Sequence, residues 1–204
     1  MKGWRSFSVP LGRTTIIFVF VVAMALLLIC TDVVCGDGVF DKVLHLEGVA
    51  FHVICSNESS LNDLTIIPVG FAGDNSPIVR KEIDGTVTGA QIADLNNDGS
   101  PEIYVFINSV GSGSYGSLVA YAGNHNTSFG TIYLPPLEDD TIAAKGYMGH
   151  DEFSVLNNHL RRRFPLYLQD DTNAQPSGGM REILYNLEQG KGGWSLQPVS
   201  IKDL

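Results

Sequence analysis

Residues Glu102–Asn108, EIYVFIN, decide the fold class, because this stretch is apolar at five consecutive positions. Successive side chains of a strand point to opposite faces, so such a strand needs cover on both faces and lies centrally in a sheet. Other short runs are rich in β-branched or aromatic residues and lie between turn-forming stretches. They predict strands at Val49–Cys55, Asp63–Val69, Pro77–Ile83, Ser117–Gly123, Arg181–Leu187 and Trp194–Ile201.

This strand spacing predicts an all-β chain with one domain, folded as an antiparallel β-sandwich or a barrel-like sheet. In Arg181–Leu187, apolar residues alternate with polar ones, which is typical of a half-buried strand. Only Ser154–Arg163 is predicted to be helical.

The N-terminal segment has the pattern of a secretory signal peptide. Three basic residues and no acidic residue occupy positions 1–13, and an unbroken apolar run, Ile16–Cys30, follows. The run is shorter than the roughly 20 residues with which a helix crosses a bilayer. Cleavage after Gly36 would separate a signal peptide, 1–36, from one β domain, 37–204. An uncleaved membrane anchor is the alternative.

Charge and cysteine content limit the partners and the means of stabilisation. The full chain has a net charge of −9, and residues 37–204 retain 10 basic and 21 acidic residues, a net charge of −11. Such a surface excludes nucleic acid and anionic membranes as partners unless there is a local basic patch, and it favours a basic partner. The mature domain keeps only Cys55, so it has no disulfide framework, and we expect Cys55 to be buried in a strand.

The turn before the central strand, DLNNDGSPE, places side-chain oxygens at alternating positions around a glycine. Calcium prefers several oxygen ligands on a tightly turning loop, and the predicted ligands are Asp94, Asn96, Asp98 and Glu102. The twelfth position, where an EF-hand has glutamate, is Val105, so a strand–loop–strand calcium turn is the form to expect. The alternative is a polar turn whose side chains cap their own backbone.

Two further clusters carry potential chemistry. His150, Asp151 and Glu152 combine an imidazole with two carboxylates, as acid–base catalysis requires, but adjacent residues of an extended segment point apart. A structural turn with a hydrogen-bonded His150 and a packed Tyr147 is the alternative. Arg161–Phe164, RRRF, is either a solvated face paired to nearby acids or an anchor for an acidic partner or a dimer mate.

The segment after the central strand, SVGSGSYGSL at Ser109–Leu118, is longer than a hairpin requires and holds one tyrosine among small residues. Hydroxyls of Ser112 and Ser114 and the amphipathic ring of Tyr115 suit insertion into a narrow polar cleft, such as one bearing catalytic carboxylates. A flexible turn with Tyr115 folded back on the sheet is equally compatible with the composition.

The chain resembles the periplasmic inhibitors of i-type (invertebrate) lysozyme from Gram-negative bacteria over about residues 48–199. The resemblance is carried by KEIDGTVTGAQIADLNNDGSPEIYVFIN (Lys81–Asn108), SVGSGSYGSLVAYAGN (Ser109–Asn124), IYLPPLEDD (Ile132–Asp140), GYMGHDEF (Gly146–Phe153), RRFPLY (Arg162–Tyr167) and GGWSLQ (Gly192–Gln197). A departure is Asn97, where the family's acidic turn has glycine.

The resemblance implies an exported, non-enzymatic β-sheet protein, often a homodimer, that protects bacteria from host lysozyme. The family's S-G-x-Y loop falls on Ser112, Gly113, Ser114 and Tyr115, so the resemblance implies that this loop enters the lysozyme active-site cleft. No cofactor is expected to be required, and the acidic turn makes calcium an optional one. No membrane contact is expected after signal cleavage. A calcium-stiffened β adhesion or carbohydrate-binding module is the alternative function, and a hydrolase using His150, Asp151 or Glu152 is a third.

Overall fold

The computed structural model describes residues 38–71, 77–124 and 127–204. The described strands belong to one compact unit. The predicted signal peptide and its cleavage site lie outside the described residues and stay predictions. Within these residues the elements are β1 Phe40–Leu46, β2 Val49–Cys55, β3 Leu61–Val69, β4 Val79–Asp84, β5 Thr86–Ala93, β6 Glu102–Asn108, β7 Gly116–Asn124, β8 Ser128–Tyr133, the 3-10 turn η1 Leu137–Asp139, β9 Glu152–Leu156, β10 His159–Pro165, β11 Met180–Gly190 and β12 Gly193–Asp203.

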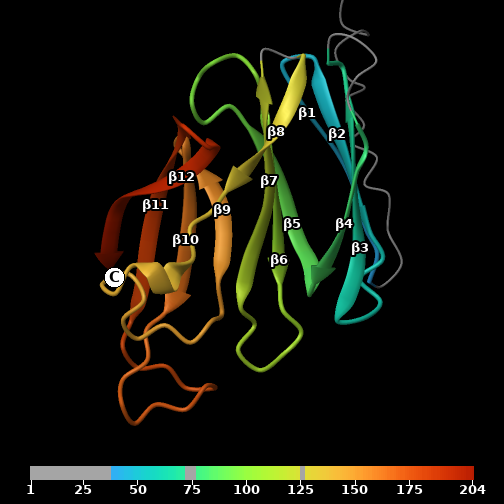
Figure 1. The fold of residues 1–204 in the computed structure, drawn as a ribbon. Helices are drawn as coiled ribbons and strands as arrows, with labels where there is room; N and C mark the ends of the chain where they lie inside the picture. Colours follow the sequence, from blue (N-terminus) through green and yellow to red (C-terminus); the bar gives the residue numbers. More distant parts are fainter. Residues whose placement is uncertain (1–37, 72–76, 125–126) are drawn as a thin grey trace, which may run out of the picture. The chain divides into compact units, whose positions relative to one another are not determined.

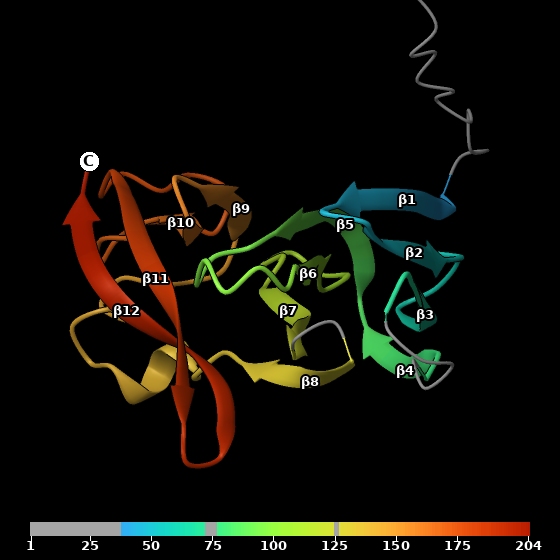
Figure 2. The same ribbon diagram turned by 90° about the horizontal axis from the view of Figure 1, so that it is seen from above.

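The strands form two sheets, which confirms the all-β prediction. One sheet has the order β1-β2-β3-β4, and the other has the order β5-β6-β7-β8-β12-β11-β10-β9. In Figures 1 and 2 the larger sheet curls round so that β9 returns towards β5, which gives a nearly closed barrel. Within the described residues, no helix has the length and apolarity that a membrane crossing would need.

The central strand β6 is covered on both faces, as its sequence predicts. Ile103, Val105 and Ile107 pack into a core shared with the smaller sheet. Tyr104 and Phe106 point the other way, into the barrel core, where strands β9–β12 supply most of the opposing side chains. Because β6 is held between two cores, the loops at its two ends have a rigid base.

The barrel has two weaker seams. Strands β5 and β9 are joined by a side chain, since Gln91 Oε1 accepts the backbone N–H of Val155 at 2.6 Å. Strands β8 and β12 pair in parallel through Trp194 with Ile132 and Ser195 with Tyr133. All other strand pairs are antiparallel.

The helix predicted at Ser154–Arg163 is wrong, because this segment is the β9–β10 hairpin. Asn157 and Asn158 both have positive φ, 48° and 60°, which is the geometry of a two-residue hairpin turn. Along β10 the burial alternates, and Arg162 lies on the inward face, where a charged residue obscures the strand pattern in the sequence.

The other strand predictions are confirmed to within a few residues at their ends, and β11 shows the expected alternating burial. Cys55 is buried and free, also as expected. Strands β1, β5 and β8 were not predicted, since their burial is partial and their polar residues interrupt the pattern.

Candidate functional site

The loop between β6 and β7 is closed at its base by its own backbone. Ser109 N–H donates to the carbonyl of Tyr115 at 2.9 Å, and Tyr115 N–H donates to Ser109 Oγ at 2.9 Å. At the tip, Ser114 N–H donates to the carbonyl of Gly111 at 3.1 Å. These bonds pair the backbone groups at both ends of the loop, so the segment is a defined turn.

Neighbouring segments hold the tip of this loop from outside. His150 N–H donates to the carbonyl of Gly113 at 2.7 Å and lies 3.2 Å from that of Ser114. The amide of Asn173 donates to the carbonyl of Ser112. Two chain segments distant in sequence therefore fix the tip, which favours a preformed projection over a flexible turn.

The contact with His150 depends on the glycine before it. Gly149 has φ of +92°, a conformation that side chains rarely adopt, and a Cβ on Gly149 would collide with the carbonyl of Gly113. Glycine at position 149 therefore lets the tip of the loop lie closer to residues 149–150 than any other residue at that position would permit.

Tyr115 combines packing with exposure. Its ring meets that of Tyr147 edge to face, with centroids 5.7 Å apart and an interplanar angle of 76°, and 49% of its surface stays exposed. One edge of the ring rests on the protein while the other is available to a partner. A pocket of about 400 Å³ opens beside it, lined in part by Tyr133, Pro136 and Glu138.

A buried ion pair supports the loop from below. Arg162 Nε lies 2.6 Å from Asp151 Oδ1, and both side chains are almost inaccessible. Asp151 Oδ2 also accepts the Tyr147 hydroxyl at 2.5 Å and the Gly116 N–H at 2.7 Å. Arg162 donates in turn to the Tyr147 hydroxyl at 2.9 Å. The carboxylate is therefore satisfied by three donors, one of which belongs to the start of β7.

The electrostatics of this network keep Arg162 charged and Tyr147 protonated. Burial lowers the pKa of Arg162, but the Asp151 carboxylate more than offsets this, so the net shift is upward and the guanidinium stays charged. Burial and the hydrogen bond to Asp151 raise the pKa of Tyr147, so its hydroxyl remains a donor. The ring of Tyr147 that supports Tyr115 is thereby locked in orientation.

The cluster His150, Asp151 and Glu152 does not form a catalytic set in this arrangement. Its imidazole lies 3.2 Å from the side-chain oxygen of Asn173, the Asp151 carboxylate is occupied by Arg162, and Glu152 is exposed. The structural-turn alternative, with a hydrogen-bonded His150 and a packed Tyr147, describes what is found.

The basic run RRRF divides between the two faces of β10. Arg161 and Arg163 lie 3.9 and 4.0 Å from Glu182, which fits the prediction of a solvated face paired to acids. Arg162 differs, because only 5% of it is exposed and it forms the buried pair with Asp151. Leu160, Arg162 and Phe164 share the buried face of β10, and the charge of Arg162 gave no indication of this in the sequence.

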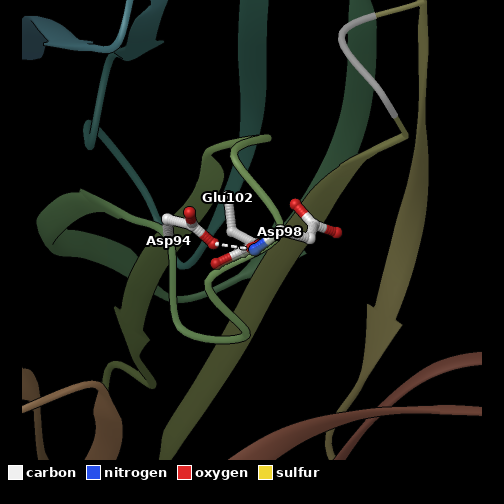
Figure 3. A group of neighbouring side chains, drawn as sticks. All are labelled: Asp94, Asp98 and Glu102. Atoms are coloured by element: carbon white, nitrogen blue, oxygen red, sulfur yellow. Dashed lines mark hydrogen bonds between the residues drawn. The ribbon is translucent and has the colours of Figure 1, made fainter.

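The predicted metal ligands come together in the turn between β5 and β6. Oxygen atoms of Asp94, Asp98 and Glu102 lie within 4.8 Å of one another, and Figure 3 shows their side chains around this turn. Asn96 Oδ1 accepts Asp98 N–H at 3.1 Å, so it belongs to the same turn. Asn97 has φ of 56°, which asparagine tolerates better than most residues, and this accounts for the absence of glycine there.

Glu102 is fully buried, and one of its oxygens has no partner. Its Oε2 accepts the N–H of Leu95 at 2.7 Å and lies 3.4 Å from the Tyr104 hydroxyl. Among the described residues nothing hydrogen-bonds to Oε1. Burial, helped by the charges of Asp94 and Asp98, raises the pKa of Glu102 to about 8.

Comparison with known proteins identifies the relationship. The family model PliI, periplasmic lysozyme inhibitor of I-type lysozyme, matches residues 53–144. Over these 92 residues, slightly less than half of the chain, the sequence is similar to that family. The match spans both the β6–β7 loop and the acidic turn, and it supports a lysozyme-inhibitor role. Neither curated proteins nor solved structures gave a match.

The sequence pointed to the loop but not to what holds it. Its small residues and single tyrosine identified Ser112–Tyr115, whereas Asn173 lies about sixty positions away in a turn-rich segment with no distinguishing pattern. The pairing of Asp151 with Arg162 was likewise not predicted, since it depends on the register of β9 with β10.

Proposed function

We propose that the protein inhibits i-type lysozyme by inserting the loop Ser112–Tyr115 into the active-site cleft of the enzyme. The observation that carries this proposal is the half-exposed Tyr115 on a loop whose tip and base are both hydrogen-bonded to the scaffold. Similarity to an inhibitor family over residues 53–144 supports the choice of target.

A preformed loop suits inhibition for an energetic reason. Ordering a free loop on binding would consume part of the interaction free energy, whereas here Gly113 and Ser112 are already held by His150 and Asn173. Tyrosine adds a large rigid contact area with one polar end. Serine hydroxyls and the tyrosine hydroxyl can donate to catalytic carboxylates in a glycosidase cleft.

The proposed inhibitor has no turnover of its own. Support comes from Asp151, whose carboxylate is committed to three donors and cannot act as a base without breaking the ion pair with Arg162. Export to the periplasm and assembly into a homodimer belong to the same proposal. The family description supports the location, and light scattering after size exclusion measures the assembly state.

A lysis assay tests the proposal directly. Turbidity of Micrococcus-type cell walls is followed with an invertebrate lysozyme, with and without the purified protein. We expect stoichiometric inhibition by wild type and strongly weakened inhibition by Tyr115→Ala. Val43→Ala is the control, because Val43 is similarly exposed on β1, outside the loop.

Two results would contradict the proposal. Full inhibition by Tyr115→Ala together with Ser112→Ala would show that another surface binds the enzyme. No effect on lysozyme, combined with calcium-dependent binding to glycans, would favour the adhesion or carbohydrate-binding alternative.

A further inference from the structure

We propose that the turn between β5 and β6 is a calcium site, with side-chain oxygens of Asp94, Asn96, Asp98 and Glu102 as ligands. This function is separate from lysozyme binding, because the site and the loop Ser112–Tyr115 lie beyond opposite ends of β6.

The spacing of the oxygens fits one calcium ion. Calcium–oxygen distances are about 2.3–2.6 Å, so two ligands on opposite sides of one ion are at most about 5 Å apart. Oxygens of Asp94, Asp98 and Glu102 all lie within 4.8 Å of one another. Small side-chain rotations would therefore close them around a common centre.

Glu102 is the second and independent indication. A buried polar atom that lacks a partner is rare in folded proteins and calls for a missing water or ion. Glu102 has no exposed surface, its Oε1 is unpaired, and one of its carboxylate oxygens lies within 4.8 Å of oxygens of both aspartates. A cation in the turn would supply the partner that Oε1 lacks.

The charges of the turn also favour a cation. Three carboxylates converge there, and within residues 38–71, 77–124 and 127–204 no ion pair includes Asp94, Asp98 or Glu102. The N–H groups of Asp98 and Gly99 each occupy one oxygen of Asp94, and each oxygen keeps a further lone pair.

The donor set favours calcium over other common ions. All proposed ligands are carboxylate or amide oxygens, whereas zinc prefers nitrogen and sulfur. Magnesium demands near-ideal octahedral geometry and retains its waters, while calcium accepts an irregular set of protein oxygens. The turn offers such an irregular set on nine consecutive residues, Asp94–Glu102.

Binding would stiffen the contact between two hairpins. The side chain of Asn97, in the middle of the turn, accepts a hydrogen bond from Asn158 Nδ2 at 2.8 Å. Asn158 belongs to the β9–β10 turn, which adjoins the seam where β5 meets β9. An ion that fixes the acidic turn would thus hold this seam as well.

Calcium titration of the full mature protein tests the site. After removal of divalent ions with EDTA, calorimetry with calcium chloride should give a dissociation constant in the range of about 0.1–1 mM, as for extracellular calcium modules. At 2 mM calcium the melting temperature should rise by about 1–7 °C, the larger value for the tighter dissociation constant, and equimolar magnesium should have a smaller effect.

Matched variants locate the ion. Asp98→Asn and Glu102→Gln should each weaken calcium binding at least tenfold, while Asp63→Asn, an exposed carboxylate on β3, should bind as wild type does. Asp98 is exposed, so its variant tests the site even if the Glu102 variant folds poorly.

Two outcomes would overturn the inference. One is an unchanged melting temperature with no binding heat at 10 mM calcium. The other is an undiminished response in Asp98→Asn, which would place the ion elsewhere. Lysozyme inhibition is measured in parallel, since Asp98→Asn should retain it, and that result separates this inference from the proposed inhibitor function.

Discussion

A buried carboxylate lies near each end of β6, and the two differ in their hydrogen-bond partners. Asp151, below the β6–β7 loop, accepts hydrogen bonds from Arg162, Tyr147 and Gly116. Glu102, at the β5–β6 turn, has one oxygen without a partner and a strongly raised pKa. Burial alone therefore does not determine whether a carboxylate stabilises or destabilises a fold. Its hydrogen-bond and ion-pair partners determine the sign of its contribution to the free energy of unfolding.

The largest expected effect on stability comes from removing the charge of Asp151, the carboxylate whose hydrogen bonds are satisfied. Asp151→Asn leaves the buried guanidinium of Arg162 without a counter-charge, and we expect the free energy of unfolding to fall by about 3–5 kcal/mol. Urea denaturation measures this loss. The control is Glu182→Gln, which removes a partly exposed partner 3.9 Å from Arg161 and should cost less than about 1 kcal/mol. A loss for Asp151→Asn no larger than the control would contradict the comparison.

The second-largest expected effect is on the binding of lysozyme by the β6–β7 loop. Tyr115→Ala should weaken binding to i-type lysozyme by about 2 kcal/mol or more, as expected for a central aromatic anchor, while the melting temperature changes little. Titration of the enzyme with the variant gives the dissociation constant. An equal loss of stability would mean that the ring serves the fold and not the partner.

At the other end of β6, replacing the carboxylate of Glu102 with an amide should increase stability, whereas Asp151→Asn should decrease it. The pKa of Glu102 lies above its unfolded value, so its folding contribution is favourable below about pH 4.5 and is lost as the pH rises to about 8. In calcium-free solution at pH 8, Glu102→Gln should therefore stabilise the protein, on the order of 2 kcal/mol.

Denaturation at pH 5 and pH 8 in EDTA measures this change. Wild type should lose stability between the two pH values relative to Glu102→Gln, whose neutral amide does not titrate. Equal pH dependence of the two proteins would mean that Glu102 is ionised without cost, contrary to its burial.

The smallest effect tests the preformed loop. Asn173→Ala removes the hydrogen bond to the Ser112 carbonyl and the contact with the His150 ring, both at an exposed position. We expect binding to lysozyme to weaken by about 1 kcal/mol with global stability unchanged. Surface plasmon resonance measures this, and unchanged affinity would mean that the loop is held sufficiently without Asn173.

The same contrast explains what the sequence could and could not predict. EIYVFIN was placed correctly because apolar residues on both faces permit only a covered strand. Ser154–Arg163 was misread as a helix because Arg162 occupies an inward position of β10, and its counter-charge Asp151 lies before β9. A charge that is buried through a tertiary pair carries no local signal of burial.

For the candidate sites too, features that are local in the sequence could be predicted, and features that depend on tertiary contacts could not. The proposed calcium ligands lie within nine residues and could be predicted together, as could the small residues of the loop Ser112–Tyr115. Their supports could not, because His150 and Asn173 reach the loop only after the barrel has formed.

The parallel seam between β8 and β12 has a consequence for how the barrel moves. Only Trp194 with Ile132 and Ser195 with Tyr133 are paired there, whereas β11 and β12 are paired along almost their whole length. Local opening proceeds where few backbone hydrogen bonds must break. Amide hydrogen exchange should therefore be faster at Ile132 and Tyr133 than in β6.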